Sequence, residues 1–320
     1  MAGLLLWAQP AWACPPEMVA ISGGTFRLGA AAQLPEEQAV DDVRLSTFCI
    51  DRHEVTNDQF LAFVSATGYV TVAERPLLSD QFPELSPAER APGSVVFQAP
   101  EANQAVPELS WWHWVPGANW RHPTGPNSDL VGKGDHPVVH MAFEDAQAYA
   151  DWAGKTLPTE AQWEFAARGG LKDQIFSWGN TYSPRKANTW QGHFPKDNSG
   201  ADGYLGTAPV ESFPPNGYGL YDMTGNVWEW TKDWYQVGHP QKAHQHNPWV
   251  SQVQDSLDPR DPGIAKHVIK GGSFLCAQNY CSRYRPAARE AQSPDTGTSH
   301  IGFRLVAPLE DFSPLLSAHS

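Results

Sequence analysis

The fold class can be predicted from Leu157-Pro-Thr-Glu-Ala-Gln-Trp-Glu-Phe-Ala-Ala-Arg-Gly-Gly170 and its surroundings. Thr159 and Gln162 have the spacing of a capping box, so a helix is expected over Thr159 to Arg168. The glycine pair that follows ends this helix. From about residue 175 onward the sequence has no helical period, and it predicts only short strands, glycines and turns.

The sequence before this stretch predicts two more helices and a few strands. One helix spans Phe143 to Ala153, and another begins within Glu54 to Val64, with Thr56 or Asn57 as its N-cap. Strands are expected at Met18 to Ser22, Gly23 to Gly29 and Val43 to Ile50, and residues 75 to 135 look irregular. The 27 Gly and 28 Pro disfavour long helices, so we predict an α+β fold: a single compact domain with little regular secondary structure.

Charge and hydropathy exclude several classes of protein. The formal net charge is -13 and no basic run occurs, which argues against nucleic acid and anionic membranes as partners. No apolar run reaches transmembrane length.

The N-terminal residues resemble a shortened signal peptide. Leu4 to Trp7 are apolar, and Ala11-Trp-Ala13 has the small-x-small pattern of a cleavage site, although no positive residue precedes it. An ordinary apolar N-terminal segment is the alternative. We therefore expect an exported protein, periplasmic or secreted, with a cytoplasmic location left open. The expected parts are a leader over 1–13, a domain over 14–310 and a tail over 311–320.

Four cysteines form two pairs by position. Cys14 precedes the first predicted strand and Cys49 lies in a later one, so an exported chain would join them in a disulfide. Two unrelated buried thiols are the alternative.

The second pair lies in Gly271-Gly-Ser-Phe-Leu-Cys-Ala-Gln-Asn-Tyr-Cys-Ser-Arg-Tyr-Arg285. Cys276 and Cys281 are five residues apart, so only a turn through the residues between them would bring both sulfurs to one site. The pair is compatible with a structural disulfide, a redox dithiol or a two-thiolate metal site. Cu(I) is the metal that two thiolates suit best, because it is soft and accepts few ligands. Spacing alone favours the disulfide.

Motifs along nearly the whole chain resemble the formylglycine-generating enzymes, also called sulfatase-modifying factors. The resemblance implies a C-type-lectin-like core. The pair of cysteines after Gly-Gly-Ser is the part most specific to the active enzymes. The other motifs are Gly24-Thr-Phe, Glu54-Val-Thr-Asn, Gly117-Ala-Asn-Trp-Arg-His-Pro123, His136-Pro-Val-Val-His140, Leu157 to Glu164, Trp178-Gly-Asn180, Pro214 to Tyr221, Gly225-Asn-Val-Trp-Glu-Trp230 and Gly302-Phe-Arg304.

What the resemblance implies is an oxidase that converts the cysteine of a Cys-x-Pro-x-Arg segment in an unfolded sulfatase to formylglycine. It uses O₂ and a thiol reductant, and the substrate thiolate joins copper as a third sulfur ligand. By position, Cys276 and Cys281 would bind Cu(I), and Ser273 would be a polar catalytic neighbour. Trp228 and His300 would border the substrate.

The resemblance also implies two structural Ca²⁺ sites, each built mainly from loop oxygens. The alternative is that these are ordinary turn residues. The first site would use Asn188, Thr189, Asp202 and Tyr204, and the second Asp222, Met223, Gly225 and Val227.

Two departures from the family pattern concern the active site. Ala277 stands where many family enzymes have His, and His300 where Asn is frequent. A second hypothesis is therefore a noncatalytic lectin-like binding module in which Cys276 and Cys281 form a structural disulfide. A third, an iron-dependent enzyme that forms sulfur–carbon bonds, would need an additional helical domain for which the chain has no room.

Overall fold

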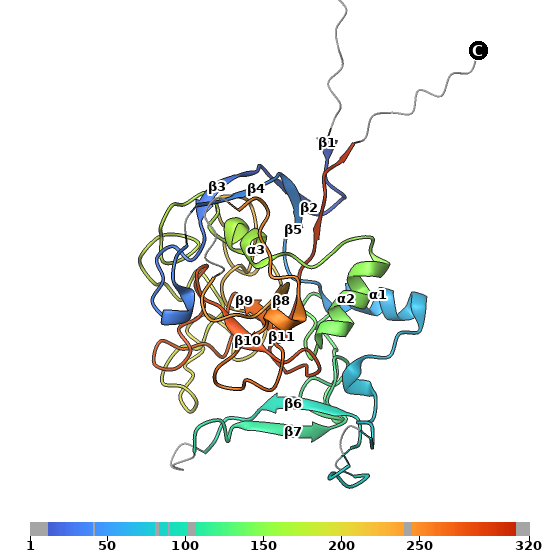
Figure 1. Ribbon diagram of the computed structural model, residues 1–320. Helices are drawn as coiled ribbons and strands as arrows, with labels where there is room; N and C mark the ends of the chain where they lie inside the picture. Colours follow the sequence, from blue (N-terminus) through green and yellow to red (C-terminus); the bar gives the residue numbers. More distant parts are fainter. Residues whose placement is uncertain are drawn as a thin grey trace, which may run out of the picture.

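The computed structural model describes residues 12–40, 42–80, 83–88, 90–101, 107–239 and 245–311. Residues 1–11 and 312–320 lie outside the described residues, so the expected leader and tail remain predictions. The pair β1 (Trp12–Ala13) and β13 (Glu310–Asp311) brings the two ends of the described chain together. Figure 1 shows this pair at the upper edge of the molecule, above the remaining strands.

The three predicted helices are present, and local sequence explains where they begin. In α1 (Asn57–Thr67), Thr56 Oγ1 accepts the Gln59 N–H and Gln59 Oε1 accepts the Thr56 N–H. The same reciprocal pair, Thr159 with Gln162, begins α3 (Glu160–Ala167), with both distances 3.0 Å. The remaining helix is α2 (Phe143–Trp152). These capping boxes confirm the predicted starts of α1 and α3.

A four-stranded sheet lies at the centre of the molecule (Figure 1). Strand β8 (Trp228–Trp234) pairs antiparallel with β9 (His267–Lys270) and parallel with β11 (Ile301–Gly302), and β10 (Glu290–Gln292) pairs with β9. Helix α3 packs on β8 and β9, where Trp163 Nε1 donates to Glu229 Oε2 at 2.7 Å. This sheet supports the segment that carries both free cysteines, because that segment leaves the end of β9.

A three-stranded sheet contains the first cysteine pair. It has the order β12 (Val306–Ala307), β5 (Phe48–Asp51) and β2 (Met18–Ile21). Cys49 lies within β5 and forms a disulfide with Cys14, their Cα atoms being 5.6 Å apart. The predicted Cys14–Cys49 disulfide is therefore confirmed.

The single strand predicted over Val43 to Ile50 is wrong, because two strands in different sheets occupy these residues. Strand β4 (Asp42–Leu45) pairs with β3 (Gly24–Arg27), whereas β5 belongs to the three-stranded sheet. Between them, Thr47 Oγ1 accepts the Gly23 N–H, and Asn247 Oδ1 accepts the Ser46 N–H. These side chains bind main-chain N–H groups and end the first strand.

Residues 75 to 135 were expected to be irregular, yet they contain a β-hairpin. Its strands are β6 (Gly93–Phe97) and β7 (Trp112–Pro116), which lie at the lower edge in Figure 1. The sequence signal was weak because a long connection separates the two strands. Short 3-10 turns complete the described elements at Pro35–Glu37, Val72–Glu74 and Val253–Asp255.

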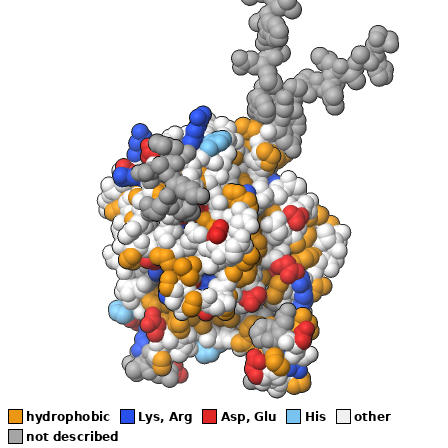
Figure 2. Space-filling view, viewed as in Figure 1, with side chains coloured by type: hydrophobic (Ala, Val, Ile, Leu, Met, Phe, Trp, Pro, Cys, Tyr) orange, Lys and Arg blue, Asp and Glu red, His pale blue; other side chains and the backbone are white. Residues whose placement is uncertain are grey.

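The fold agrees with the predicted class, α+β with few helices and many loops. The largest apolar cluster joins α1, α2 and the central sheet, and it includes Phe60, Trp120, Trp230 and Cys276. Lys and Arg side chains are scattered among acidic ones on the face in Figure 2. None of the helices in the described residues is long and apolar enough to cross a membrane.

Candidate active site and cation sites

Two glycines fold the cysteine segment back on itself. Gly271 and Gly272 have φ values of 94° and 71°, which L side chains rarely adopt. A Cβ on Gly272 would lie 2.9 Å from the main chain of Tyr284. The two ends of the segment therefore pack directly against each other, and residues 273 to 283 form a closed loop.

Turns inside this loop bring the two thiols together. The Cys276 N–H donates to the Ser273 carbonyl at 2.9 Å, and the Tyr280 N–H donates to the Ala277 carbonyl at 3.3 Å. The second bond closes the turn that the five-residue spacing required. Cys276 is buried and Cys281 half-buried, and both are free thiols that hydrogen-bond to each other. The structure thus places both sulfurs at one site.

The two thiols differ in acidity. Burial, reinforced by the neighbouring Cys281, raises the pKa of Cys276 well above its ordinary value. A hydrogen bond from Cys276 lowers the pKa of Cys281 despite burial, and the main-chain N–H and charge of Arg283 act in the same direction. Cys281 is therefore the sulfur that ionises first, with Cys276 as its hydrogen-bond donor.

The three arginines after the cysteines are held by carboxylates. Arg285 forms two hydrogen bonds with Glu37, and Arg289 forms two with Glu160. Arg283 lies 2.7 Å from Glu36 Oε1. Structural pairing therefore accounts for all three, and only Arg283 also affects a thiol.

The other predicted site residues lie on neighbouring segments. Ser273 is buried, and its Oγ accepts the Leu275 N–H at 3.2 Å. Trp228 belongs to the same apolar cluster as Cys276, and Cys281 packs against that cluster. The Trp228 N–H donates to the His300 carbonyl at 2.9 Å. The structure thus places Ser273, Cys276 and Cys281 on one loop, and a main-chain hydrogen bond joins Trp228 on β8 to His300.

Sequence reasoning did not identify the surroundings of His300. Its ring lies 4.7 Å from that of Trp112 on β7, and its Nδ1 is within hydrogen-bonding distance of Thr298 Oγ1. Burial and the nearby His140 lower the pKa of His300 to about 3, so its ring is neutral at neutral pH. His140 is itself fully buried between Ser94 Oγ and the Pro123 carbonyl, each 2.8 Å away. In the sequence, only the motif His136-Pro-Val-Val-His140 drew attention to His140.

The first predicted calcium segment is rich in oxygen atoms. Asp202 accepts the N–H groups of Thr189 and Tyr204 at 3.0 and 3.1 Å, and the adjacent Asn188 donates to the Gly206 carbonyl. Gln191 Nε2 lies within 3.4 Å of four oxygen atoms, which exceeds the two protons it can donate. Burial raises the pKa of Asp202. This set of oxygens fits a hard cation such as Ca²⁺.

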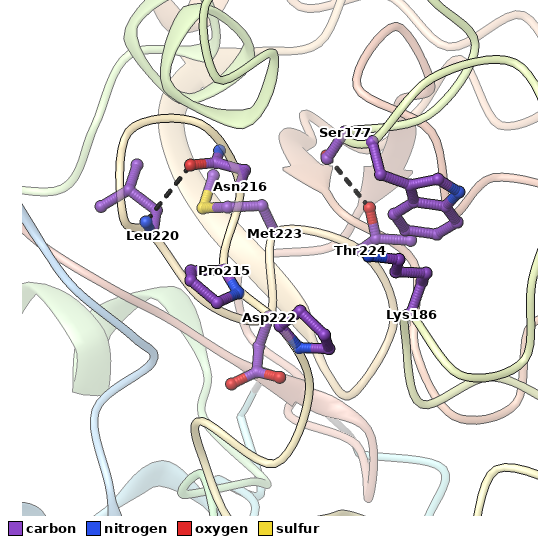
Figure 3. A pocket seen from close by; sticks show the side chains of 10 residues that line it. Ser177, Lys186, Pro215, Asn216, Leu220, Asp222, Met223 and Thr224 are labelled. Atoms are coloured by element: carbon purple, nitrogen blue, oxygen red, sulfur yellow. Dashed lines mark hydrogen bonds between the residues drawn. The ribbon is translucent and has the colours of Figure 1, made fainter.

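The second predicted segment follows directly before β8. Burial raises the pKa of Asp222 to about 6, and its Oδ2 accepts the Glu211 N–H at 2.9 Å. Asp222 and Met223 border a cavity of about 20 Å³, which is room for about one water molecule. In Figure 3 the Asp222 carboxylate points away from Met223 and Asn216. Gly225 packs against the first segment, since a Cβ there would lie 2.1 Å from the Asn188 carbonyl oxygen.

Two buried carboxylates near Asp222 were not predicted as site residues. Glu54 is fully buried, and neither of its oxygens has a hydrogen-bond partner among the described residues. Burial and the charge of Asp222 raise its pKa well above the ordinary value. Glu229 accepts two hydrogen bonds from Arg304, both 2.7 Å. One arginine thus faces three carboxylates, and a cation would offset the excess negative charge.

No group of three or more His, Cys, Asp and Glu side chains in the described ranges converges as a metal site. A two-thiolate site and sites built largely from carbonyl oxygens do not require such a group. The ligand sets of Cys276 with Cys281, and of the two loop segments, therefore remain predictions that the arrangement of residues fits.

Comparison with known proteins shows the family. Residues 8–309 match the model of the sulfatase-modifying factor enzyme 1-like domain. The chain is 52% identical over 299 residues to the formylglycine-generating enzyme of Thermomonospora curvata, covering 91% of this chain and 93% of that protein. It is 49% identical over 296 residues to the enzyme of the same name from Mycobacterium tuberculosis, with coverages of 91% and 97%. It is also 38% identical over 327 residues to a mouse protein named inactive C-alpha-formylglycine-generating enzyme 2, with coverages of 96% and 94%.

Solved structures agree on the fold. PvdO from Pseudomonas aeruginosa superposes with a TM-score of 0.64 at 25% identity, over 92% of this chain and 95% of that one. This likeness is in keeping with the predicted C-type-lectin-like core. By the match of its sequence and of its fold, this chain belongs to the sulfatase-modifying factor, or formylglycine-generating enzyme, family.

Proposed function

We propose that this protein is a copper-dependent oxidase that converts the cysteine of a Cys-x-Pro-x-Arg segment in unfolded sulfatases to formylglycine. The observation that carries the proposal is the free thiol pair Cys276 and Cys281, held at one site by a closed loop. It occurs in a chain about half identical to proteins named formylglycine-generating enzyme. A relative named as inactive is 38% identical to this chain, so the fold alone does not establish the activity, and the proposal rests on the thiol pair.

The donor set supports copper as the metal. Within the part of the chain that the structure describes, no third His, Cys, Asp or Glu joins the two cysteines in a metal-binding group, and two thiolates alone suit a soft ion of low coordination number. When bound, Cu(I) would supply a redox centre with room for a third sulfur and for O₂. The chain itself contributes the Cys281 thiolate, a neighbouring thiol on Cys276, and the Ser273 N–H, which hydrogen-bonds to the Cys276 sulfur.

The reaction balances with O₂ and a thiol reductant. The substrate –CH₂SH group, one O₂ and two reductant thiols give the aldehyde –CHO, hydrogen sulfide, one water and one disulfide. The β-carbon and the reductant thiols each lose two electrons, and O₂ gains all four. In this proposal, the apolar cluster that contains Cys276 and Trp228 excludes water from the substrate sulfur. The neutral ring of His300 borders the substrate without adding charge.

We propose Ca²⁺ as the structural cation of both oxygen-rich segments. The excess of carboxylates over cations around Asp222, and the convergence of oxygen atoms around Asp202 and Gln191, support this assignment. The proposed ligands are those predicted from the sequence, with Glu54 and Glu229 as additional negative charge nearby. Calcium would hold the two loops together where Gly225 meets Asn188.

We also propose that the protein is exported, to the periplasm or the medium. Disulfides form and persist mainly in oxidising compartments, and the Cys14–Cys49 disulfide supports such a location. Secretion of the full-length chain, measured by fractionation of the expressing cells, tests this assignment.

The experiment that tests the function is mass spectrometry of a Cys-x-Pro-x-Arg peptide incubated with the reduced, copper-loaded protein, air and a thiol. An aldehyde product is expected from the wild type and not from Cys276→Ser or Cys281→Ser. A wild type that binds the peptide, forms no aldehyde and keeps Cys276 and Cys281 as a disulfide in excess reductant would favour the noncatalytic binding module.

A further inference from the structure

The cysteine loop, residues 273 to 283, has an exposed tip. Cys276 is buried, whereas residues 278 to 280 are exposed. Exposed loop segments with few packing contacts are ordinarily the most mobile parts of a structure. Cys281 directly follows this tip, so the position of its sulfur relative to Cys276 depends on what holds the tip in place.

Asn279 holds the tip by binding both main-chain groups of Phe194. Its Oδ1 accepts the Phe194 N–H and its Nδ2 donates to the Phe194 carbonyl, each at 3.2 Å. A carboxamide offers one acceptor and a donor, so it can pair with a peptide group as a neighbouring strand residue would. The Tyr280 ring adds a second contact, because it stacks on the Phe194 ring with the centroids 4.5 Å apart.

The short segment of residues 190 to 194 also holds Cys276. The Trp190 N–H donates to the Cys276 carbonyl at 3.0 Å. Trp190 and Phe194 are both buried, and their rings pack edge to face with the centroids 5.1 Å apart. The Trp190 Nε1 donates to the Asp197 carbonyl at 2.7 Å, which closes the segment on itself. Both halves of the cysteine loop are therefore docked on one packed segment.

We propose that Asn279 is a positioning residue for the thiol pair: by fixing the loop tip on Phe194, it holds the Cys281 sulfur close to that of Cys276. Without its side chain, Cys276 keeps its bond to Trp190, but the half of the loop that carries Cys281 loses two hydrogen bonds to the same segment. The effective concentration of one thiol at the other then falls. The inference rests on the proposed function in its consequence for Cu(I), since two thiolates must reach one ion.

The loop tip offers a variant and a matched control. Because Asn279 is exposed, water can replace its side chain at the Phe194 N–H and carbonyl, so Asn279→Ala should fold. Gln278 is exposed on the same tip, and its side chain forms no hydrogen bond within the described ranges. Gln278→Ala therefore removes a similar side chain without removing an anchor.

Two measurements on the full-length protein test the role. The first is the equilibrium of the Cys276–Cys281 disulfide with glutathione in the metal-free protein, which reports the effective concentration of the two thiols. The second is the dissociation constant for Cu(I), from competition with a chromophoric chelator. Asn279→Ala should lower the disulfide equilibrium constant about tenfold and weaken Cu(I) binding about tenfold, because two hydrogen bonds are lost. Gln278→Ala should change neither.

Urea unfolding of the reduced proteins separates positioning from stability. A loss confined to the unfolding free energy of Asn279→Ala would mean that this residue only stabilises the fold. An unchanged disulfide equilibrium in Asn279→Ala, or an equal change in Gln278→Ala, also overturns the positioning role. A changed disulfide equilibrium with an unchanged Cu(I) constant retains the positioning of the thiols and overturns its role in metal binding.

The proposed function fails in a different way. A wild type that binds Cu(I) but forms no aldehyde from any Cys-x-Pro-x-Arg peptide overturns the oxidase, and one that binds no Cu(I) overturns the copper site. In both cases the disulfide equilibrium of Asn279→Ala against Gln278→Ala still decides whether Asn279 positions the thiol pair.

Discussion

The Trp190 N–H donates a hydrogen bond to the Cys276 carbonyl at 3.0 Å. Trp190 directly follows Asn188 and Thr189, two of the predicted ligands of the first calcium ion. The main chain of the buried cysteine is therefore held by the loop that the cation is expected to order. Loss of the cation should consequently affect both stability and the thiol pair.

Removing calcium should lower the melting temperature, and Asp202→Ala should reduce that response because it removes one of the two proposed sites. A ligand present at about 100 times its Kd stabilises a protein by about 2.7 kcal/mol, so chelation should lower the melting temperature by several degrees. Differential scanning fluorimetry with and without EGTA measures the shift. The control is Asp261→Ala, whose carboxylate is half-exposed and lies 3.1 Å from Lys266 Nζ. An equal chelation shift in Asp202→Ala would contradict the assignment.

The Glu229–Arg304 pair should be far more important for stability than a surface pair. Arg304→Met leaves the buried Glu229 without its ion-pair partner, so a loss of about 3–5 kcal/mol is expected. Arg260→Met, at a residue 56% exposed in its pairs with Asp258 and Glu290, should cost about 1 kcal/mol or less. Urea unfolding in calcium buffer measures both. Similar losses in the two variants would refute the electrostatic account.

His267 should make the protein sensitive to acid. It is stacked between Phe143 and Trp234, and burial lowers its pKa from 6.5 to about 4. Between those pH values the unfolded chain binds a proton that the folded chain does not, so stability falls as the pH decreases from 6.5 to 4. One pKa unit corresponds to about 1.4 kcal/mol, which sets the loss at up to about 3 kcal/mol.

His267→Phe should reduce this sensitivity while keeping the aromatic stack. Its unfolding free energy, measured in urea at pH 7 and again near pH 4.5, should change less than that of the wild type. An unchanged difference between the two pH values would mean that other groups cause the acid sensitivity.

The two free cysteines should react at different rates. Cys281 has the lowered pKa and the greater exposure, and the thiolate is the reactive form. In the reduced, metal-free protein, iodoacetamide should label Cys281 before Cys276, as followed by peptide mass spectrometry. Cys276→Ala removes the hydrogen bond and should slow the labelling of Cys281 at neutral pH. Faster labelling of Cys276 in the wild type would reverse the assignment of the thiolate.

Local features of the fold could be predicted, because their determinants lie within a few residues. The capping pairs Thr56 with Gln59 and Thr159 with Gln162 place the starts of α1 and α3. The division of Val43 to Ile50 into two strands could not be predicted, because Asn247 binds Ser46 from 201 residues away. The β6–β7 hairpin was missed for a related reason, since a long connection hides its pairing.

The candidate site shows the same division between local and distant determinants. The spacing of Cys276 and Cys281 specified which turn was needed, and that turn is present. Glu54 lies in one of the family motifs, but its role could not be predicted, because the charges of Asp222 and Arg304 that act on its pKa are distant in sequence. The enclosure of His300 by Trp112 likewise depends on a strand nearly 200 residues earlier. Charge balance and aromatic enclosure become visible only when the chain is folded.

The most direct test of the copper-oxidase proposal is a titration of the metal-free, reduced protein with Cu(I), with aldehyde formed per chain measured by mass spectrometry in a single turnover. The account predicts no aldehyde without copper, a yield that rises in proportion to copper, and a plateau at one copper per chain. Cys276→Ser should give no product at any ratio. Aldehyde formation that is independent of copper, or equal in the variant, would contradict the assignment of the Cys276–Cys281 pair as the copper site.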